Sequence, residues 1–144
     1  MNFKVLLKLG IVAGILMNAF DIVVQGMLMA GLYAAPVFRN PEEEIVNLVL
    51  TDFAAAFVFV WLYLRLGSAT GSGVAGGATF GFYAGVLYSF PMFYAMHLLF
   101  NGYTSELAWI NTVYQILVYV IVGATAGALN TTHSQSIAVS VSGS

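Results

Sequence analysis

Four apolar segments constrain this chain more than any other feature, because each is close to the ~20 residues that a helix needs to cross the hydrocarbon of a bilayer. We place them at residues 5–33, 44–65, 76–101 and 106–129. Only 7% of the residues are charged and the mean hydropathy is +0.91, so the chain cannot present the polar surface of a water-soluble domain. The sequence predicts an all-α, polytopic membrane protein with four transmembrane helices in an up-down bundle.

The predicted spans form one transmembrane domain over residues 1–129, and we expect the polar C-terminal tail, residues 130–144, to be disordered. A weak internal similarity relates residues 10–16, Gly-Ile-Val-Ala-Gly-Ile-Leu, to residues 81–87, Gly-Phe-Tyr-Ala-Gly-Val-Leu. A true repeat would organise the bundle as two tandem helix pairs. Membrane composition alone also produces such matches, so both arrangements stay open.

The basic residues predict the orientation of the spans. Lys4 and Lys8 also fit the charged start of a signal peptide, but the apolar run that follows is too long and lacks a cleavage site. In a four-span topology, Lys4, Lys8 and Arg65 lie on one side of the membrane and Arg39 lies on the other. The positive-inside rule then places both termini in the cytoplasm, and we expect the chain in the cell membrane.

Composition also limits the partners and cofactors. With four Lys and Arg residues in total and a net charge of −2, the chain has no basic patch for nucleic acid. The absence of cysteine excludes disulfides and thiolate metal sites. Haem is disfavoured because His97 is the only histidine within a predicted span. We expect no cofactor; the expected partners are the lipid bilayer and either a second copy of the chain or another membrane protein.

Small residues recur every fourth position along three of the predicted spans, which places them on one ridge of each helix. Such ridges let a neighbouring backbone approach closely. We interpret them as packing seams without chemistry. The longest seam comprises Gly73, Gly77, Gly81, Gly85 and Ser89, and the shorter ones are Gly10 with Gly14 and Gly123 with Gly127.

Two acidic residues, Asp21 and Asp52, lie inside apolar spans that contain no Lys or Arg near them. A carboxylate in hydrocarbon costs at least a few kcal/mol, so it normally faces a bundle interior, a wet cavity or a partner. Burial and a neighbouring carboxyl both favour the protonated form. We therefore expect the two acids to share a proton.

Other polar side chains lie at similar depths in the same half of the membrane. At the helical rise, Gln25, Asp52 and Gln115 lie roughly 12 to 14 Å from the outer boundary, and Asp21 lies at about 18 Å. The spacing of Asn18, Asp21 and Gln25 puts them on one face of the first span. The sequence thus predicts an outward-facing polar pocket. Its candidate ligand- or ion-binding residues are Asp21, Asp52, Gln25, Asn18, Gln115, Asn111 and His97.

Three functions remain compatible with this pattern. The first is the binding or carriage of a proton, a cation or a small polar or cationic ligand by the pocket around Asp21 and Asp52. The second is a structural or accessory subunit of a larger membrane complex, in which the same residues only hold helices together. The third is a metal-dependent enzyme that uses Asp21, Asp52 and His97. The sequence does not favour an enzyme, since it contains no HExxH motif or comparable ligand spacing, and we assign no catalytic or metal-binding residue.

Overall fold

The computed structural model describes residues 2–33 and 44–142, with side chains as far as residue 131. All regular structure in these ranges is helical, which confirms the all-α prediction. The α-helices are α1 (Phe3–Phe20), α2 (Ile45–Leu66), α3 (Gly73–Leu99) and α4 (Ser105–Ser142), and the shorter helices are η1 (Asp21–Leu28), η2 (Ala30–Tyr33) and η4 (Gly67–Thr70). Arg39, on which part of the predicted orientation depends, lies outside the described residues.

Three helical stretches of the described chain are long and apolar enough to cross a membrane: Phe3–Leu28, Ile45–Thr70 and Ser105–Thr131. Many of the large apolar side chains on the molecular surface are well exposed; Leu28 is 76% exposed and Leu87 is 78% exposed. A water-soluble chain of this size would bury such residues. The fold is therefore consistent with a membrane protein.

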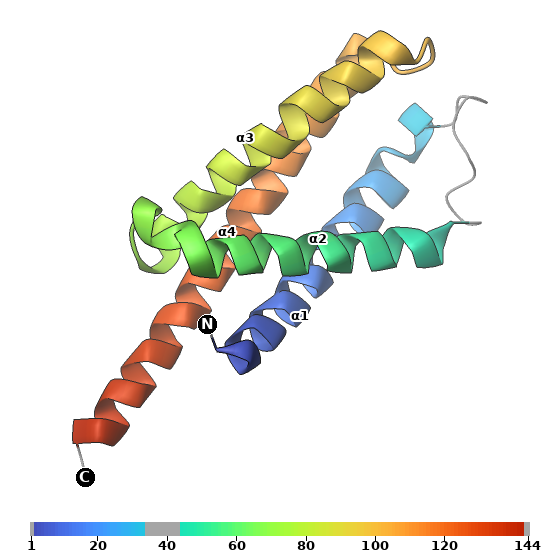
Figure 1. The fold of residues 1–144 in the computed structure, drawn as a ribbon. Coiled ribbons are helices and arrows are strands. Elements are labelled where there is room, and N and C mark those ends of the chain that lie inside the picture. Colours follow the sequence, from blue (N-terminus) through green and yellow to red (C-terminus); the bar gives the residue numbers. More distant parts are fainter. Residues whose placement is uncertain (1, 34–43, 143–144) are drawn as a thin grey trace.

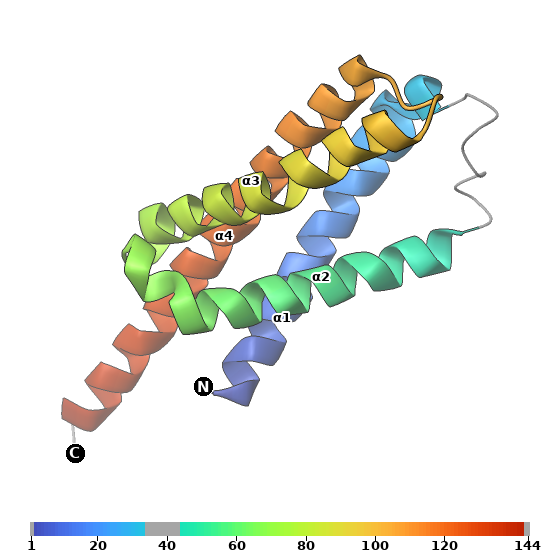
Figure 2. The ribbon, with the colours of Figure 1, turned by 45° about the horizontal axis from the view of Figure 1, so that its top comes forward.

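The helices α3 and α4 lie side by side and run in opposite directions (Figures 1 and 2). Their backbones touch along most of the shared length. A Cβ atom added to Gly77 would overlap the carbonyl group of Gly123, and one added to Gly81 would overlap the carbonyl group of Tyr119. Only glycine permits this approach, which maximises van der Waals contact where apolar burial supplies little driving force.

The helix α2 crosses α1 obliquely rather than running alongside it (Figure 1). The ring of Phe57 lies against Gly10 and the ring of Phe53 lies against Gly14, so glycines spaced by four on α1 accept rings spaced by four on α2. When rows of this spacing interlock on both helices, the preferred crossing angle is about 50°. The oblique crossing therefore follows from the sequence pattern.

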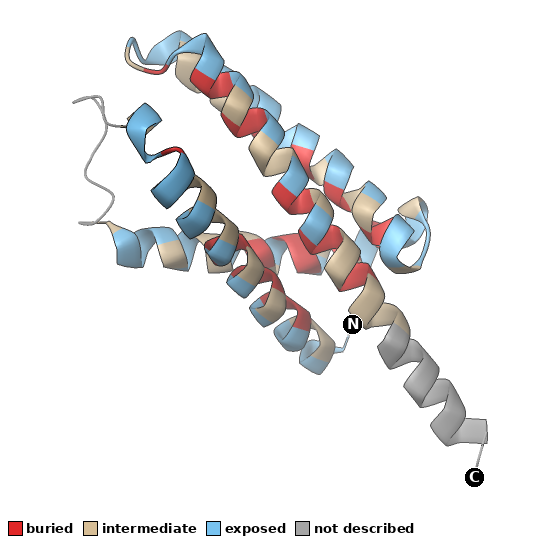
Figure 3. Ribbon diagram, turned by 180° about the vertical axis from the view of Figure 1, so that it is seen from behind, coloured by how far each residue is buried: buried red, intermediate tan, exposed pale blue. Residues whose placement is uncertain are grey.

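The larger apolar cluster of the described residues joins the α1–α2 pair to the α3–α4 pair. Phe59 of α2 contacts Tyr119 of α4 with ring centroids 5.2 Å apart, and it contacts Phe80 of α3 at 5.5 Å. Figure 3 shows the corresponding buried stripes on α1 and α4, which face inward. The buried members of the cluster are Leu9, Ala13, Met17, Ala56, Phe59, Val60, Val118, Tyr119 and Val122.

The first span and the C-terminal tail differ most from the sequence prediction, whereas α3, at Gly73–Leu99, differs by two or three residues at each end. The first span is not one α-helix over residues 5–33, because α1 ends at Phe20 and continues as the π-helix η1 and the 3-10 helix η2. At the other end, the segment from Asn130 that we expect to be disordered continues α4 as far as Ser142. No Gly or Pro occurs between Ala128 and Ser142, so nothing in that stretch interrupts the helix.

Candidate functional site

Asp21 lies at the point where the first helix changes its geometry. It is the first residue of η1, a π-helix of eight residues that directly continues α1. Further along, the backbone N–H of Met29 donates to the carbonyl oxygen of Val24 at 2.8 Å, which is the i→i+5 pattern of a π-helix. Such segments are rare and frequently occur at functional sites.

The carboxyl group of Asp21 accepts hydrogen bonds from two side chains. The Tyr114 hydroxyl donates to Oδ1 at 2.6 Å, and Nε2 of Gln25 donates to the same oxygen at 3.0 Å. Tyr114 belongs to α4, 93 residues further along the chain. The two donors hold the carboxyl group between two helices.

Asp52 approaches the same carboxyl group from α2. The side chains of Asp21 and Asp52 are close enough for a hydrogen bond between their carboxyl groups. Such a bond requires a proton on one of the two, because an ionised carboxylate has no donor. Half-buried side chains from α1–η1, α2 and α4 therefore meet at one point.

Two of the candidate residues do not bind this carboxyl pair. Asn18 is buried, and its Nδ2 donates to the carbonyl oxygen of Gly14 at 2.9 Å, one turn earlier in α1. The Oε1 atom of Gln115 is also buried and has no hydrogen-bond donor within the described part of the chain. The hydrogen bond to Asp21 comes from Tyr114, the residue directly before Gln115 in the sequence.

Asn111 and His97 belong to a second polar cluster at the end of the molecule where α3 meets α4. The Tyr33 hydroxyl donates to Oδ1 of Asn111 at 2.6 Å, and Nδ2 of Asn111 donates to the Tyr103 hydroxyl at 2.7 Å. Nδ1 of His97 lies 2.8 Å from the carbonyl oxygen of Tyr103. Burial raises the pKa of the Tyr103 phenol to about 12. This cluster fastens η2 to α4 and to the α3–α4 connection.

The site residues predicted from the sequence do not include Tyr114, Tyr33 or Tyr103. For Tyr114 a signal was present, because it is three residues from Asn111 and shares a helix face with it. Tyr33 and Tyr103 flank predicted spans, where tyrosine is common for reasons of membrane insertion alone. Their pairing with Asn111 depends on how distant segments meet.

The structure separates His97 from the two acids. Among the described residues, no three His, Cys, Asp or Glu side chains are grouped so that they could hold a metal ion. His97 instead contacts the backbone of Tyr103. The set Asp21, Asp52 and His97, considered above for a metal enzyme, is thus not brought together.

The chain matches no protein-family model, and no curated protein or solved structure is significantly similar to it. Fold and composition therefore define its class: an all-helical protein with helices apolar enough to cross a membrane. The features of the structure that bear on function are the polar groups inside those helices.

Proposed function

We propose that this chain is a four-span membrane protein that binds and carries a proton or a small cation at the Asp21–Asp52 carboxyl pair. In this proposal α3 is the fourth span. It is 27 residues long, contains no Asp, Glu, Lys or Arg, and lies along α4. A helix that runs antiparallel to a membrane-spanning helix over this length crosses the same bilayer.

The proposal rests on the close approach of three side chains, those of Asp21, Asp52 and Tyr114. Two carboxyl groups in contact within hydrocarbon cannot both be ionised without strong repulsion, so one proton is shared between them. The pair then has a net charge of −1, which a second proton or a monovalent cation would neutralise. Ionisable groups placed in this way inside membrane proteins commonly mark ion or proton pathways.

We infer different roles for the two acids from their hydrogen bonds. Asp21 accepts from Tyr114 and Gln25, and donors of this kind stabilise an ionised carboxylate. Asp52 has Asp21 as its only side-chain hydrogen-bond partner among the described residues. In the proposal, Asp21 is the fixed acceptor, and Asp52 is the acid that gains and loses the proton.

A flux measurement tests the proposal directly. The purified protein is reconstituted into liposomes containing a pH-sensitive dye, and a proton gradient is imposed with and without an alkali cation. We expect proton entry with the wild-type protein and entry no faster than in empty liposomes with Asp52→Asn. Glu106→Gln is the matched control, because it removes an exposed acid at the start of α4 and should leave the flux unchanged.

A hydrophobic carbodiimide provides a second readout, since it modifies protonated carboxyl groups from within the lipid phase. We expect mass spectrometry to find the adduct on Asp52, and we expect a cation that binds the pair to slow its formation. Wild-type flux in Asp52→Asn, or an adduct confined to Glu106, would contradict the proposal.

The second candidate function is a structural or accessory subunit. It is favoured by the fact that Asp21 and Asn111 already have protein partners, so their polar groups need no ligand. The same variants distinguish the two functions. A subunit without chemistry would show no flux in the wild type, and Asp21→Asn would lower the yield of folded protein and its co-purification with a membrane partner.

A contact with a second copy of the chain is part of the proposal. Within the apolar 18-residue stretch of the second span, only 17% is buried inside the molecule, whereas 39% is buried in the corresponding stretch of the span formed by α4. Val58 on α2 is 58% exposed, whereas Val60 is fully buried. If copies meet along α2, Val58→Cys should form a disulfide-linked dimer on oxidation, and Val60→Cys should not.

A further inference from the structure

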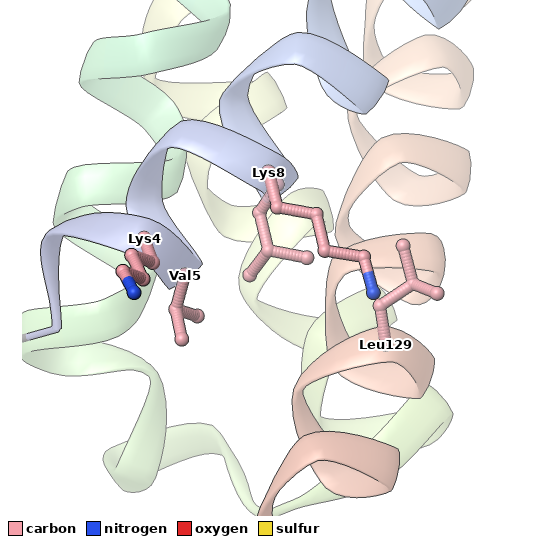
Figure 4. A pocket seen from close by; sticks show the side chains of 5 residues that line it. Lys4, Val5, Lys8 and Leu129 are labelled. Carbon is pink, nitrogen blue, oxygen red and sulfur yellow. The ribbon is translucent and has the colours of Figure 1, made fainter.

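A small cavity lies between the first turns of α1 and the part of α4 that passes them. It measures about 110 Å³ and is lined by Lys4, Val5, Lys8, Leu9 and Leu129. Figure 4 shows the Lys8 side chain extending across the cavity toward Leu129 of α4. The volume is of the same order as the roughly 150 Å³ apolar cavity that accepts a benzene ring. The cavity can therefore take a short apolar segment of a ligand.

Two positive charges border this apolar space. Lys4 and Lys8 are four residues apart, which places them on one face of α1, and both are exposed. Among the described residues, neither forms an ion pair with a carboxylate. Glu44 directly precedes α2 and Glu106 lies in the first turn of α4, and Asp21 and Asp52 lie next to each other. The lysines thus have positive charge available for a ligand.

We propose that this site binds an anionic phospholipid. The phosphate would lie between the Lys4 and Lys8 ammonium groups, and the first part of an acyl chain would occupy the space among Val5, Leu9 and Leu129. Basic pockets between membrane helices commonly bind acidic headgroups. Apolar walls next to the charges favour a lipid over a soluble anion, because burying a free phosphate there would cost hydration without apolar gain. The inference does not depend on the carboxyl site.

Native mass spectrometry of the detergent-purified protein tests this inference. The probes are palmitoyl-oleoyl phosphatidylglycerol, the zwitterionic phosphatidylcholine with the same acyl chains, and glycerol 3-phosphate. We expect the wild-type protein to retain one phosphatidylglycerol molecule in preference to phosphatidylcholine. It should retain no glycerol 3-phosphate, which has the phosphate but lacks the acyl chains.

Four variants separate the contributions of charge and shape. The double variant Lys4→Gln/Lys8→Gln should bind phosphatidylglycerol about 30-fold more weakly, as expected for two lysines near an anionic surface. Lys4→Arg/Lys8→Arg should retain the lipid. Leu129→Trp, which fills the cavity and leaves both charges, should also weaken binding. Arg65→Gln removes one positive charge from the end of α2, where Arg65 stacks on Trp61, and should not change binding.

Each other outcome contradicts the proposal in a distinct way. Equal loss of binding in Arg65→Gln and in the lysine variant would indicate a general surface attraction rather than this site. Unchanged binding in Leu129→Trp would show that the cavity is not used. Retention of glycerol 3-phosphate by the wild-type protein would identify a soluble anion as the ligand. Circular dichroism of every variant confirms that the helices are intact.

Discussion

The Tyr114 hydroxyl donates to Oδ1 of Asp21 at 2.6 Å and so joins α4 to the residue at which the first helix changes from α to π geometry. The bond connects the α3–α4 pair to the α1–α2 pair through polar groups, beside the apolar cluster that connects them elsewhere. Any movement of one pair against the other would stretch this bond. Its removal should therefore affect both stability and any transport.

Replacing Tyr114 with Phe tests the contribution of this bond. The variant leaves the ring in place and removes only the donor. We therefore expect the free energy of unfolding to fall by about 0.5 to 2 kcal/mol, as for other interhelical hydrogen bonds in membranes. Reversible unfolding in mixed micelles measures this free energy. Tyr83→Phe is the matched control, because Tyr83 is 62% exposed. An equal effect in both variants would show that the Tyr114 bond contributes nothing specific.

Gly77→Ala should separate α3 from α4. The new Cβ atom would overlap the Gly123 carbonyl group, which is backbone and cannot rotate away, so we expect destabilisation by about 1 to 3 kcal/mol. Gly31→Ala makes the same chemical change where no atom lies within 4 Å and should have little effect. Unfolding midpoints of the two variants give the comparison, and a stable Gly77→Ala protein would contradict the observed backbone contact.

Ionisation of Tyr103 should destabilise the fold at high pH. Its pKa is raised from 10.0 to about 12 by burial, so the folded state binds the phenolic proton more tightly than the unfolded state does. This contribution to stability is complete below pH 10 and is lost as the pH rises toward 12. Stability measured against pH should fall less steeply in this window for Tyr103→Phe than for the wild type. A parallel decline would show that Tyr103 does not titrate as described.

Single cysteines can test the proposed orientation, because the chain contains no cysteine of its own. Asn101 in the α3–α4 connection and Ser68 in the α2–α3 connection are both exposed. With both termini in the cytoplasm, Asn101→Cys should react with a membrane-impermeant thiol reagent on intact cells. Ser68→Cys should react only after the membrane is permeabilised. The reverse pattern would invert the orientation.

Hydrophobic patterning predicts much of the fold because helices in this chain are long and apolar. The structure places α2 at Ile45–Leu66, against a prediction of residues 44–65, and starts α4 at Ser105 rather than at residue 106. No hydrophobic pattern marks the π-helix that follows Phe20. Its backbone pattern depends on local hydrogen bonding, and no Gly or Pro lies between Gly14 and Asp21 to mark a change.

The site was less predictable than the fold, for a geometrical reason. The contact between Asp21 and Gln25 follows from their spacing of four on one helix. The approach of Tyr114 to Asp21 depends on the relative rotation of α1 and α4, which residue spacing within one helix does not contain. The predicted depth in the membrane puts Gln115 near the level of the two acids. The rotation of α4 about its axis, however, directs Tyr114 rather than Gln115 to Asp21.

The backbone contact between α3 and α4 has a consequence for biosynthesis. Among the described helices, α3 has the length of a membrane span, but it is not among the three stretches that length and composition mark as able to cross a membrane. Its glycines bring its backbone into contact with that of α4. We therefore expect α3 to enter the bilayer only after α4 has been synthesised, and the two helices to insert together as a helical hairpin. Truncation of the chain before residue 105 should then leave α3 outside the bilayer.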